Sequence, residues 1–317
     1  MKPRGLVVSN PNATSTSPQV RDIITRALSG EADIEVVTTT HRGHAEQLAA
    51  EVRDIDLIVT LGGDGTINEV VNGLMGSGRE HLPMLATIPG GSANVLARAL
   101  GFPNDAIEAT GMILESLRTQ TTHTIGLGQA TFRTEEEPEQ HSHWFTINAG
   151  LGLDADVLAA MEAQRAEGHA ATPARYARVA TSSYLRSPER TKGLFSLQLP
   201  GEEPIENLAL VIVQNTAPWT YFGPVPINPL PDASFDKGLD VFAPHSLGIV
   251  SAARFGLRML RGSKAGSVNG RLTLLHDLAE FVVRSQEPAG LQVDGDHLGR
   301  TTEVHFRSVP AALTIVG

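Results

Sequence analysis

The chain has 317 residues, about twice the length of a usual single domain, so we expect two domains. Hydrophobic residues make up 41% of the sequence, which is enough to bury sizeable cores and excludes a disordered protein. The formal net charge of −10 argues against a general nucleic-acid binder, because such proteins pair phosphates with Lys and Arg.

The absence of cysteine excludes thiol nucleophiles, Cys-ligated metal sites and disulfides. No apolar run approaches the roughly 18 residues that a membrane-spanning helix needs. The apolar stretch at residues 5–8 is too short for the core of a signal peptide and instead predicts a buried strand. We therefore expect a soluble protein, and the lack of cysteine allows a reducing cytoplasm without requiring it.

Residues 1–121 alternate strand patterns with helix patterns. Short apolar or β-branched runs predict strands at 6–9, 34–38, 57–61 and 84–88. Apolar residues at helical spacing follow each run, and the first helix has Ser17 as N-cap and Pro18 in its first position. This alternation indicates a parallel sheet covered on both faces, whose ligands bind at the carboxyl ends of the strands.

From residue 122 onward the pattern changes to short strands separated by Gly, Pro and acidic turns, which is typical of an antiparallel sandwich or barrel. Strands are predicted at 122–125, 144–147, 194–199, 208–213, 239–242, 272–275, 281–283, 291–293 and 313–316. Two helices are predicted at 155–166 and 174–186, and an exposed loop at 133–143. We therefore predict domains over 1–121 and 122–317, with the functional cleft between them.

A glycine-rich turn between the third predicted strand and the next helix is the most informative segment. Gly62, Gly63 and Gly65 let the backbone approach a ligand closely, and the N–H groups at a helix start suit a phosphate. The helix is predicted to begin near Thr66, in a capping box with Glu69. Taken alone, the segment also fits a tight structural turn.

A second turn of the same kind follows the fourth predicted strand. It contains Gly90 and Gly91, and Ser92 is predicted to cap the short helix that follows. Two such turns on consecutive strands favour a nucleotide-binding site. A P-loop kinase is excluded, because the chain has no Gly-x-x-x-x-Gly-Lys-Ser/Thr.

These two turns, together with residues 148–155, 231–240 and 294–296, resemble the diacylglycerol kinase catalytic-domain family, which includes bacterial soluble lipid kinases and sphingosine kinases. More distantly the chain is similar to NAD kinases and phosphofructokinases, which share the Gly-Gly-Asp-Gly turn. The resemblance implies an α/β nucleotide-binding domain with a parallel sheet, followed by an antiparallel β-sandwich domain. It also implies ATP-dependent phosphorylation of the hydroxyl of diacylglycerol or a related lipid, giving phosphatidic acid from diacylglycerol.

The resemblance places ATP on the first domain. The residues that would contact it are Asn10, Pro11, Asn12, Ala13, Thr14, Thr40, Gly62, Gly63, Asp64, Gly65, Thr66, Ile67, Asn68 and Ser92. Asp64, an acid inside an anion-binding turn, would organise a catalytic Mg²⁺ between its carboxylate and the phosphates. Val95 stands where the family usually has a further acid, which leaves a catalytically weak nucleotide-binding regulator as one alternative.

The resemblance also implies a catalytic base in the second domain. Asp296 fills a position where the family has Glu, and its side chain is one methylene shorter. Its neighbours Asp294 and His297 could substitute as the base. An ordinary hairpin turn between two strands is the alternative interpretation of residues 294–296.

A structural Mg²⁺ site is implied in the loop over residues 234–240. Its ligands would be Asp236 through its carboxylate, and Ser234 and Leu239 through their carbonyls. Lys237 stands where a second acid is common, and a plain turn before a strand is an equal alternative.

A lipid kinase has to reach a substrate held in a bilayer. Residues 246–264 carry four Lys or Arg residues and no acid, which predicts either an interfacial helix at anionic headgroups or a solvated basic face. The groove for acyl chains is expected near residues 155–186 and 219–222. We expect a cytoplasmic enzyme peripheral to the inner face of the membrane. An NAD kinase remains the other enzyme alternative, and a homodimer is left open.

Overall fold

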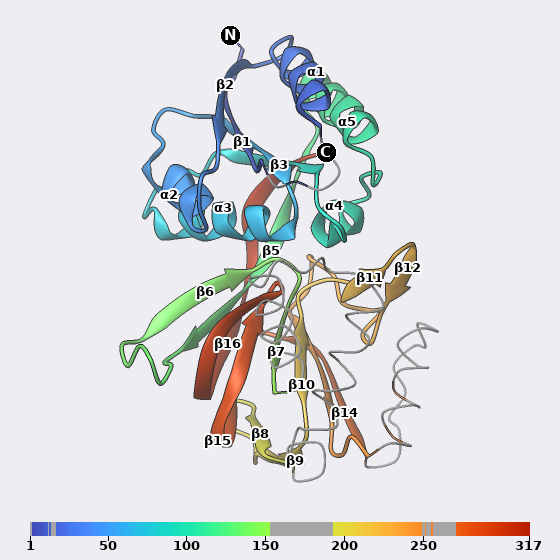
Figure 1. The fold of residues 1–317 in the computed structure, drawn as a ribbon. Coiled ribbons are helices and arrows are strands. Elements are labelled where there is room, and N and C mark those ends of the chain that lie inside the picture. The colour runs from blue at the N-terminus through green and yellow to red at the C-terminus, as the bar shows by residue number, and fades with distance from the viewer. Residues whose placement is uncertain are drawn as a thin grey trace. The chain divides into compact units, whose positions relative to one another are not determined.

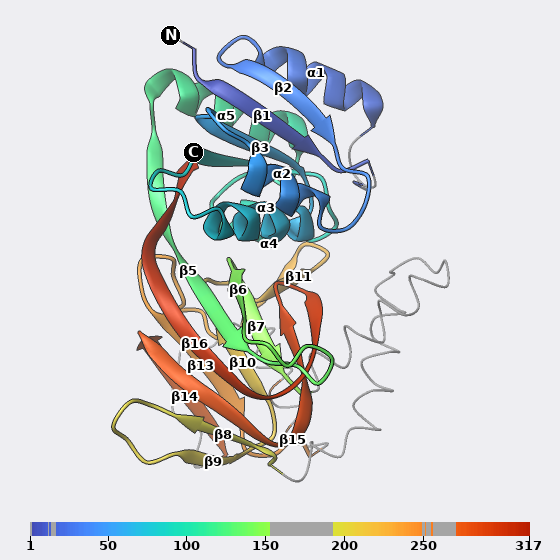
Figure 2. The same ribbon diagram turned by 90° about the vertical axis from the view of Figure 1, so that its left-hand side faces the viewer.

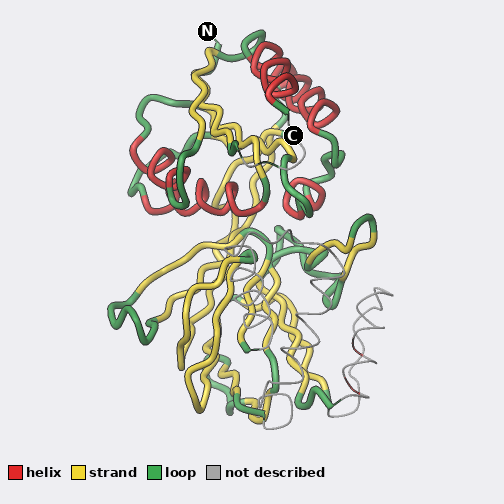
Figure 3. Tube along the Cα trace, viewed as in Figure 1, coloured by secondary structure: helices red, strands yellow, loops and turns green. Residues whose placement is uncertain are grey.

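The computed structural model describes residues 2–11, 13, 17–152, 193–248, 251, 255 and 271–317. Two compact units are present, shown by the ribbon in Figure 1. The first comprises Met1–Leu127 together with Pro310–Gly317, and the second comprises Gly128–Val309. The helices α1 to α5 belong to the first unit, as the colouring by secondary structure shows (Figure 3). The predicted domain limits, 1–121 and 122–317, stay a prediction.

The first unit is built on a parallel sheet with the strand order β4-β3-β1-β2. The end of β16 (Asp296–Val316) adds a further parallel strand beside β4, through Ile315 opposite Leu85. The strands closely follow the four predicted runs: β1 (Arg4–Ser9), β2 (Asp33–Thr38), β3 (Leu57–Gly62) and β4 (Met84–Pro89).

Helices cover both faces of this sheet. One pair, α1 (Pro18–Leu28) and α5 (Ala106–Thr119), packs on one face, and the pair α2 (His44–Glu51) and α3 (Asp64–Gly76) lies on the other (Figure 2). The fifth helix, α4 (Val95–Ala99), follows β4. The core under α1 and α5 contains Ile24, Leu28 and Ile113 with alternate residues of the central strands. Strand alternation supplies that face, since successive side chains point to opposite sides.

The start of α1 confirms the predicted cap, because the hydroxyl of Ser17 accepts a hydrogen bond from the N–H of Val20 at 3.3 Å. The predicted capping box in α3 is wrong. This helix begins at Asp64 with Gly63 as N-cap, so Glu69 lies beyond the first turn and cannot reach the cap N–H. The Glu69 carboxylate instead accepts from the N–H groups of Gly43 at 2.9 Å and Ala45 at 3.1 Å, and so caps α2.

The second unit is antiparallel in the part of the chain that the structure describes. The sheet runs β14-β13-β10-β7-β15-β16, with β8 and β9 beside β15 and the β5–β6 hairpin beside β16. The strand bounds are β5 (Thr122–Phe132), β6 (His141–Phe145), β7 (Asn148–Leu151), β8 (Phe195–Gln198), β9 (Ile205–Leu208), β10 (Val211–Gln214), β13 (Leu239–Pro244), β14 (Leu272–Leu278) and β15 (Glu280–Val293). Two predicted strands, at 281–283 and 291–293, are parts of the single strand β15.

A separate two-stranded sheet in this unit pairs β11 (Thr220–Phe222) with β12 (Val225–Ile227). The main core of the unit contains Phe145, Phe195, Phe281 and Phe306 among aliphatic residues of the paired strands. The predicted helices at 155–166 and 174–186 and most of the basic segment 246–264 lie outside the described residues. Among the described helices, none is long and apolar enough to cross a membrane.

Candidate functional site

The two predicted glycine turns lie against each other at the carboxyl ends of β3 and β4. Gly62 pairs with Pro89 in the parallel register, and the N–H of Gly90 donates to the carbonyl of Gly62 at 2.8 Å. A Cβ atom on Gly91 would lie 2.6 Å from the Cα of Gly63, closer than two carbons can approach. The backbone-to-backbone packing of the turns therefore requires glycine there.

The carboxylate of Asp64 joins the first turn to the helix that follows the second. It accepts hydrogen bonds from the N–H groups of Val95 and Leu96, each at 3.1 Å, and these are donors at the start of α4. Asp64 therefore satisfies helix-terminal donors that the helix itself cannot. The Val95 side chain is itself buried, with 4% exposure.

The predicted cap of α4 by Ser92 is wrong. The N-cap is Asn94, which adopts a left-handed conformation with φ 48°, and Ser92 is exposed two residues before it. The Asn94 side chain instead closes the turn, because its Oδ1 accepts from the N–H of Gly91 at 2.8 Å.

The loop after β1 reaches the same place. The Asn10 side chain donates to the hydroxyl of Thr66 at 3.1 Å, and the Asn10 N–H donates to the carbonyl of Leu61 at 3.0 Å. A Cβ on Gly90 would lie 3.2 Å from the Cβ of Ala13. The loops after β1, β3 and β4 therefore meet at one end of the sheet, as predicted. Pro11 is exposed beside them, and Asn12 and Thr14 lie outside the described residues.

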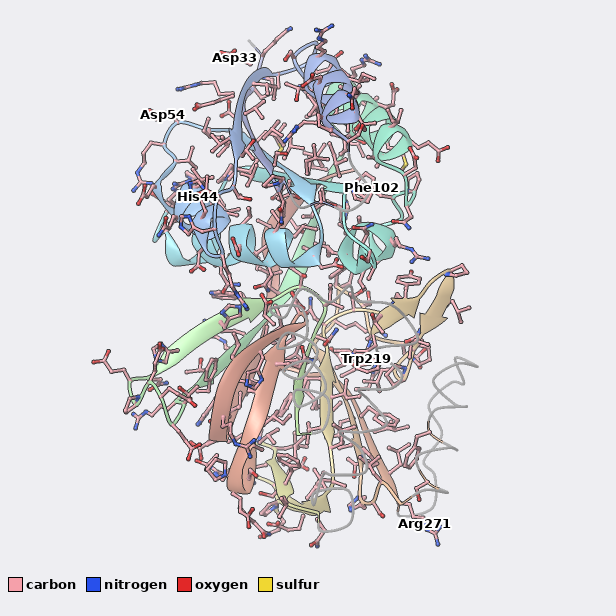
Figure 4. The ribbon with its side chains drawn as sticks, viewed as in Figure 1. Asp33, His44, Asp54, Phe102, Trp219 and Arg271 are labelled. Atoms are coloured by element: carbon pink, nitrogen blue, oxygen red, sulfur yellow. The ribbon has the colours of Figure 1, made fainter. Side chains whose placement is uncertain are left out.

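Other predicted nucleotide residues hold the surrounding structure. Ile67 is buried in the core with 2% exposure, and the buried Asn68 side chain accepts from Asn72 Nδ2 at 3.0 Å. Thr40 is exposed in the loop after β2, where its N–H donates to His44 Nδ1 at 3.1 Å. His44 lies at the start of α2, as Figure 4 labels it. No described contact brings Thr40 to the glycine turns.

The first turn of α3 is the open part of this site. Gly65, its second residue, is exposed, and a Cβ built on it would have nothing within 4 Å. Helix N-termini present unpaired N–H donors and the positive end of the helix dipole. The arrangement therefore offers exposed backbone at a helix N-terminus, which suits a phosphate group.

In the second unit, residues 294–296 form the turn between β15 and β16. Asp294 and Gly295 both have positive φ, 47° and 89°, which is the conformation of a two-residue hairpin turn. Asp296 is the first residue of β16 and pairs with Val293, and its side chain is partly exposed. The hairpin interpretation therefore describes the backbone, and it places Asp296 in the first pair of the β15–β16 ladder.

The buried carboxylate of Asp294 holds this turn to the preceding segment. It accepts four hydrogen bonds, from the N–H and hydroxyl of Thr146 at 2.7 and 2.8 Å and from the N–H groups of Ile147 and Asn148 at 2.9 Å each. Burial raises the pKa of Asp294, and these hydrogen bonds oppose the rise. With its oxygens engaged by four donors, Asp294 acts as an anchor for the turn.

The predicted metal loop is organised by its own backbone. The carbonyl of Ser234 accepts from the N–H of Lys237 at 3.1 Å, its hydroxyl accepts from the N–H of Asp236 at 3.3 Å, and the Asp236 side chain is exposed. Leu239 is a buried residue of β13. In the described ranges no three His, Asp or Glu side chains gather to hold a metal ion, so the two Mg²⁺ sites stay predictions.

A buried acid next to this loop was missed by the sequence reasoning. The side chain of Asp240 is 1% exposed and contacts His276 Nδ1 at 2.5 Å, and it also accepts from the N–H of Asp277 at 3.0 Å. Burial raises the pKa of Asp240, while these partners lower it. Its partners are more than 30 residues away along the chain, so no local pattern could have revealed them.

Comparison with known proteins gives sequence matches to kinases over much of the first unit. Residues 4–130 match the diacylglycerol kinase catalytic domain. A diacylglycerol kinase of Bacillus subtilis is 51% identical over 71 residues, which is 22% of this chain and 23% of that protein. A probable lipid kinase YegS-like of Chromohalobacter salexigens is 37% identical over 101 residues, 31% of this chain and 32% of that protein. The matched part thus spans a third or less of these relatives.

Solved structures extend the likeness of the fold to the whole chain. A putative diacylglycerol kinase from Bacillus anthracis superposes with a TM-score of 0.73 at 21% identity, covering 99% of this chain and 96% of that one. An NAD kinase from Archaeoglobus fulgidus in complex with ATP superposes with a TM-score of 0.51 at 13% identity, covering 99% of this chain and 93% of that one. The predicted fold class is therefore confirmed: the fold is that of the NAD kinase and diacylglycerol kinase group. In sequence, the match to the diacylglycerol kinase catalytic domain covers residues 4–130.

Proposed function

We propose that this chain is an ATP-dependent lipid kinase that phosphorylates the hydroxyl of diacylglycerol or a closely related lipid. The observation that carries the proposal is the pair of glycine turns packed backbone to backbone, with the open first turn of α3 beside them. The family of residues 4–130 and the lipid-kinase names of its relatives support the same activity.

The residues of the first unit fit the phosphates of ATP. Phosphoryl transfer asks the protein mainly for positioning and for stabilisation of charge. The glycine turns bring main-chain atoms to the surface, and the exposed Gly65 leaves room for a ligand at the helix N-terminus. Asn10 and Thr66, joined at 3.1 Å, hold the loop after β1 beside that surface. When bound, ATP would supply the phosphoryl group and the leaving group.

These residues do not form a site that would hold a metal ion by protein side chains alone. The Asp64 carboxylate already accepts two backbone N–H groups, and the described part of the chain has no cluster of three metal-binding side chains. Kinase Mg²⁺ is commonly held by one or two carboxylates together with the substrate phosphates. Titrating ATP with and without Mg²⁺ tests directly whether nucleotide binding requires the ion.

Asp296 is the proposed base in the second unit. Its carboxylate would accept the proton of the lipid hydroxyl as that oxygen bonds to the transferred phosphorus and the bond to the ADP oxygen breaks. The four hydrogen bonds to Asp294 fix the turn from which Asp296 projects. A carboxylate one methylene shorter than the family's Glu depends on such a fixed backbone.

The nucleotide half of the proposal is tested by Gly65→Ala. Alanine in a helix is more favourable than glycine by up to about 1 kcal/mol, so this variant should fold at least as well as the parent. It should nevertheless bind ATP about tenfold or more weakly, because the new methyl group occupies the phosphate surface. The matched control is Gly76→Ala at the other end of α3, where a Cβ also meets nothing within 4 Å. Equal ATP affinity in the two variants would show that the N-terminus of α3 does not bind the phosphates.

The substrate half is tested with labelled ATP and a panel of diacylglycerol, sphingosine, ceramide and NAD. Labelled phosphatidic acid supports the proposal, labelled NAD would replace it with an NAD kinase, and no labelled product would indicate a nucleotide-binding regulator. Asp296→Asn should keep ATP binding and lose turnover, since an amide cannot accept the proton. Unchanged turnover would exclude Asp296 from the mechanism.

A further inference from the structure

The β11–β12 hairpin stands apart from the main sheet of the second unit (Figure 1). Its strands pair Thr220 with Ile227 and Tyr221 with Pro226, and a two-residue turn joins them. Residues 223–226 are all exposed, and Val225, at 42% exposure, is among the most exposed large hydrophobic residues described. The tip thus presents Pro-Val-Pro to solvent.

This hairpin lies in a part of the chain without charge. Residues 207–231 contain no Asp, Glu, Lys, Arg or His, although charged residues make up 19% of the chain. Part of that range is the buried strand β10, whose apolar character the core explains. The core does not explain the exposed tip, since surface loops of a soluble protein ordinarily carry polar or charged residues.

The hairpin is held firmly at its base. Trp219 packs on an apolar cluster that contains Leu230 and Phe242, and Figure 4 labels this Trp at the base of the hairpin. The Trp219 N–H donates to the carbonyl of Ile227 at 3.1 Å, and its carbonyl accepts from the Asn148 side chain at 3.1 Å. The two prolines at the tip limit backbone freedom further, since their φ is fixed. A rigid tip loses little entropy on binding.

We propose that the tip of the β11–β12 hairpin, residues 223–226, inserts into the interface of a lipid bilayer and so brings the enzyme to its substrate. The inference rests on the proposed lipid-kinase function for its biological purpose. An exposed apolar tip above a Trp and a Tyr is the composition that membrane interfaces favour, because aromatic side chains with one polar group settle at headgroup depth.

A second copy of this chain is a less suitable binding partner for the tip than a bilayer. Stable protein interfaces bury about 800 Å² on each partner, and a hairpin that spans only residues 220–227 offers far less surface. Attraction by charge does not explain insertion of the tip either, because residues 223–226 carry no charge. Insertion should therefore be driven by apolar contact and should depend little on salt or anionic lipid.

The test uses the absence of natural cysteine, which allows one site at a time to be labelled. Val225→Cys carries an environment-sensitive fluorophore, and Val36→Cys, at 39% exposure on β2, is the matched control. With phosphatidylcholine vesicles, the label at position 225 should shift to the blue and be quenched by a bilayer-embedded quencher, in low and high salt alike. The label at position 36 should not change. Equal responses at both positions, or no response at position 225, would overturn the proposal.

A charge at the tip gives an independent test. Val225→Asp should lower the vesicle-bound fraction about tenfold, because a carboxylate resists transfer out of water, whereas Val36→Asp should leave it unchanged. Turnover of a short-chain, water-soluble diacylglycerol should be the same in Val225→Asp and the parent, while turnover on vesicles falls. Equal vesicle binding by Val225→Asp and the parent would overturn the insertion. Absence of turnover in the parent on both substrates, with insertion intact, would instead overturn only the proposed kinase function.

Discussion

Replacing Asp294 by Ala would remove the acceptor of four hydrogen bonds from the interior of the second unit. Three of the donors are backbone N–H groups, at Thr146, Ile147 and Asn148, and the fourth is the Thr146 hydroxyl. The hydroxyl can turn to another acceptor, but the three amides are fixed by the backbone. Each buried donor left without a partner costs about 1–3 kcal/mol. Because water entering the cavity would satisfy some of the donors, we expect a loss of about 3–5 kcal/mol.

The two tryptophans report on this unit, since Trp144 and Trp219 both belong to residues 128–309. Urea unfolding followed by their fluorescence should show the midpoint of Asp294→Ala well below that of the parent. Asp232→Ala, at an exposed position of the same unit, is the control and should change stability by less than about 0.5 kcal/mol. A loss below about 1 kcal/mol for Asp294→Ala would refute the assignment of Asp294 as the anchor of the turn.

Three further predictions concern other contacts of the two units. Asp64→Ala should lower the free energy of unfolding by about 1–2 kcal/mol and speed amide hydrogen exchange at the start of α4, since the N–H groups of Val95 and Leu96 lose their acceptor. Unchanged exchange at these two amides would contradict this. Gly91→Ala should cost about 1–3 kcal/mol in thermal unfolding and weaken ATP binding as the turns separate, and a neutral effect on both would argue against the close packing. Burial raises the pKa of Asp240 above 3.8, so its stabilising contribution is full below that pH and is lost as the pH rises through the folded-state pKa. The deficit in Tm of Asp240→Asn should therefore shrink as the pH rises from 3.8, and a deficit that grows would show that His276 keeps the carboxylate ionised.

Much of the first unit could be predicted from its sequence because local signals were consistent. Short apolar runs predicted the four strands. Ser17 and Pro18, which are neighbours in the sequence, predicted the start of α1. The glycine turns were found for the same reason, since short-range motifs carry their own geometry. Helix caps that come from another element were not predicted. Glu69 in α3 caps α2, and Asp64 in α3 caps α4, and no sequence pattern tells which helix a carboxylate will reach.

The candidate site in the second unit was predictable only in part. The turn at residues 294–296 follows from its Asp-Gly sequence, but the burial of Asp294 depends on the segment at residues 146–148, which lies far away in the chain. The length of β15 was predicted wrongly for a related reason. The polar residues between 283 and 291 suggested a break between two short strands, but they lie within this one long, partly exposed strand. Pairing partners, more than composition, decide where such a strand ends.

The return of residues 310–317 to the first unit has a consequence for how the protein matures. Ile315 pairs beside β4, Val316 is buried in the first core, and the carbonyl of Gly317 lies 2.8 Å from His123 Nδ1. During synthesis, the first unit keeps an open sheet edge beside β4 until residues 310–317 have been translated. A chain that stops before residue 310 would therefore lack the strand beside β4 and leave apolar residues of the first core uncovered, which chaperones and proteases recognise.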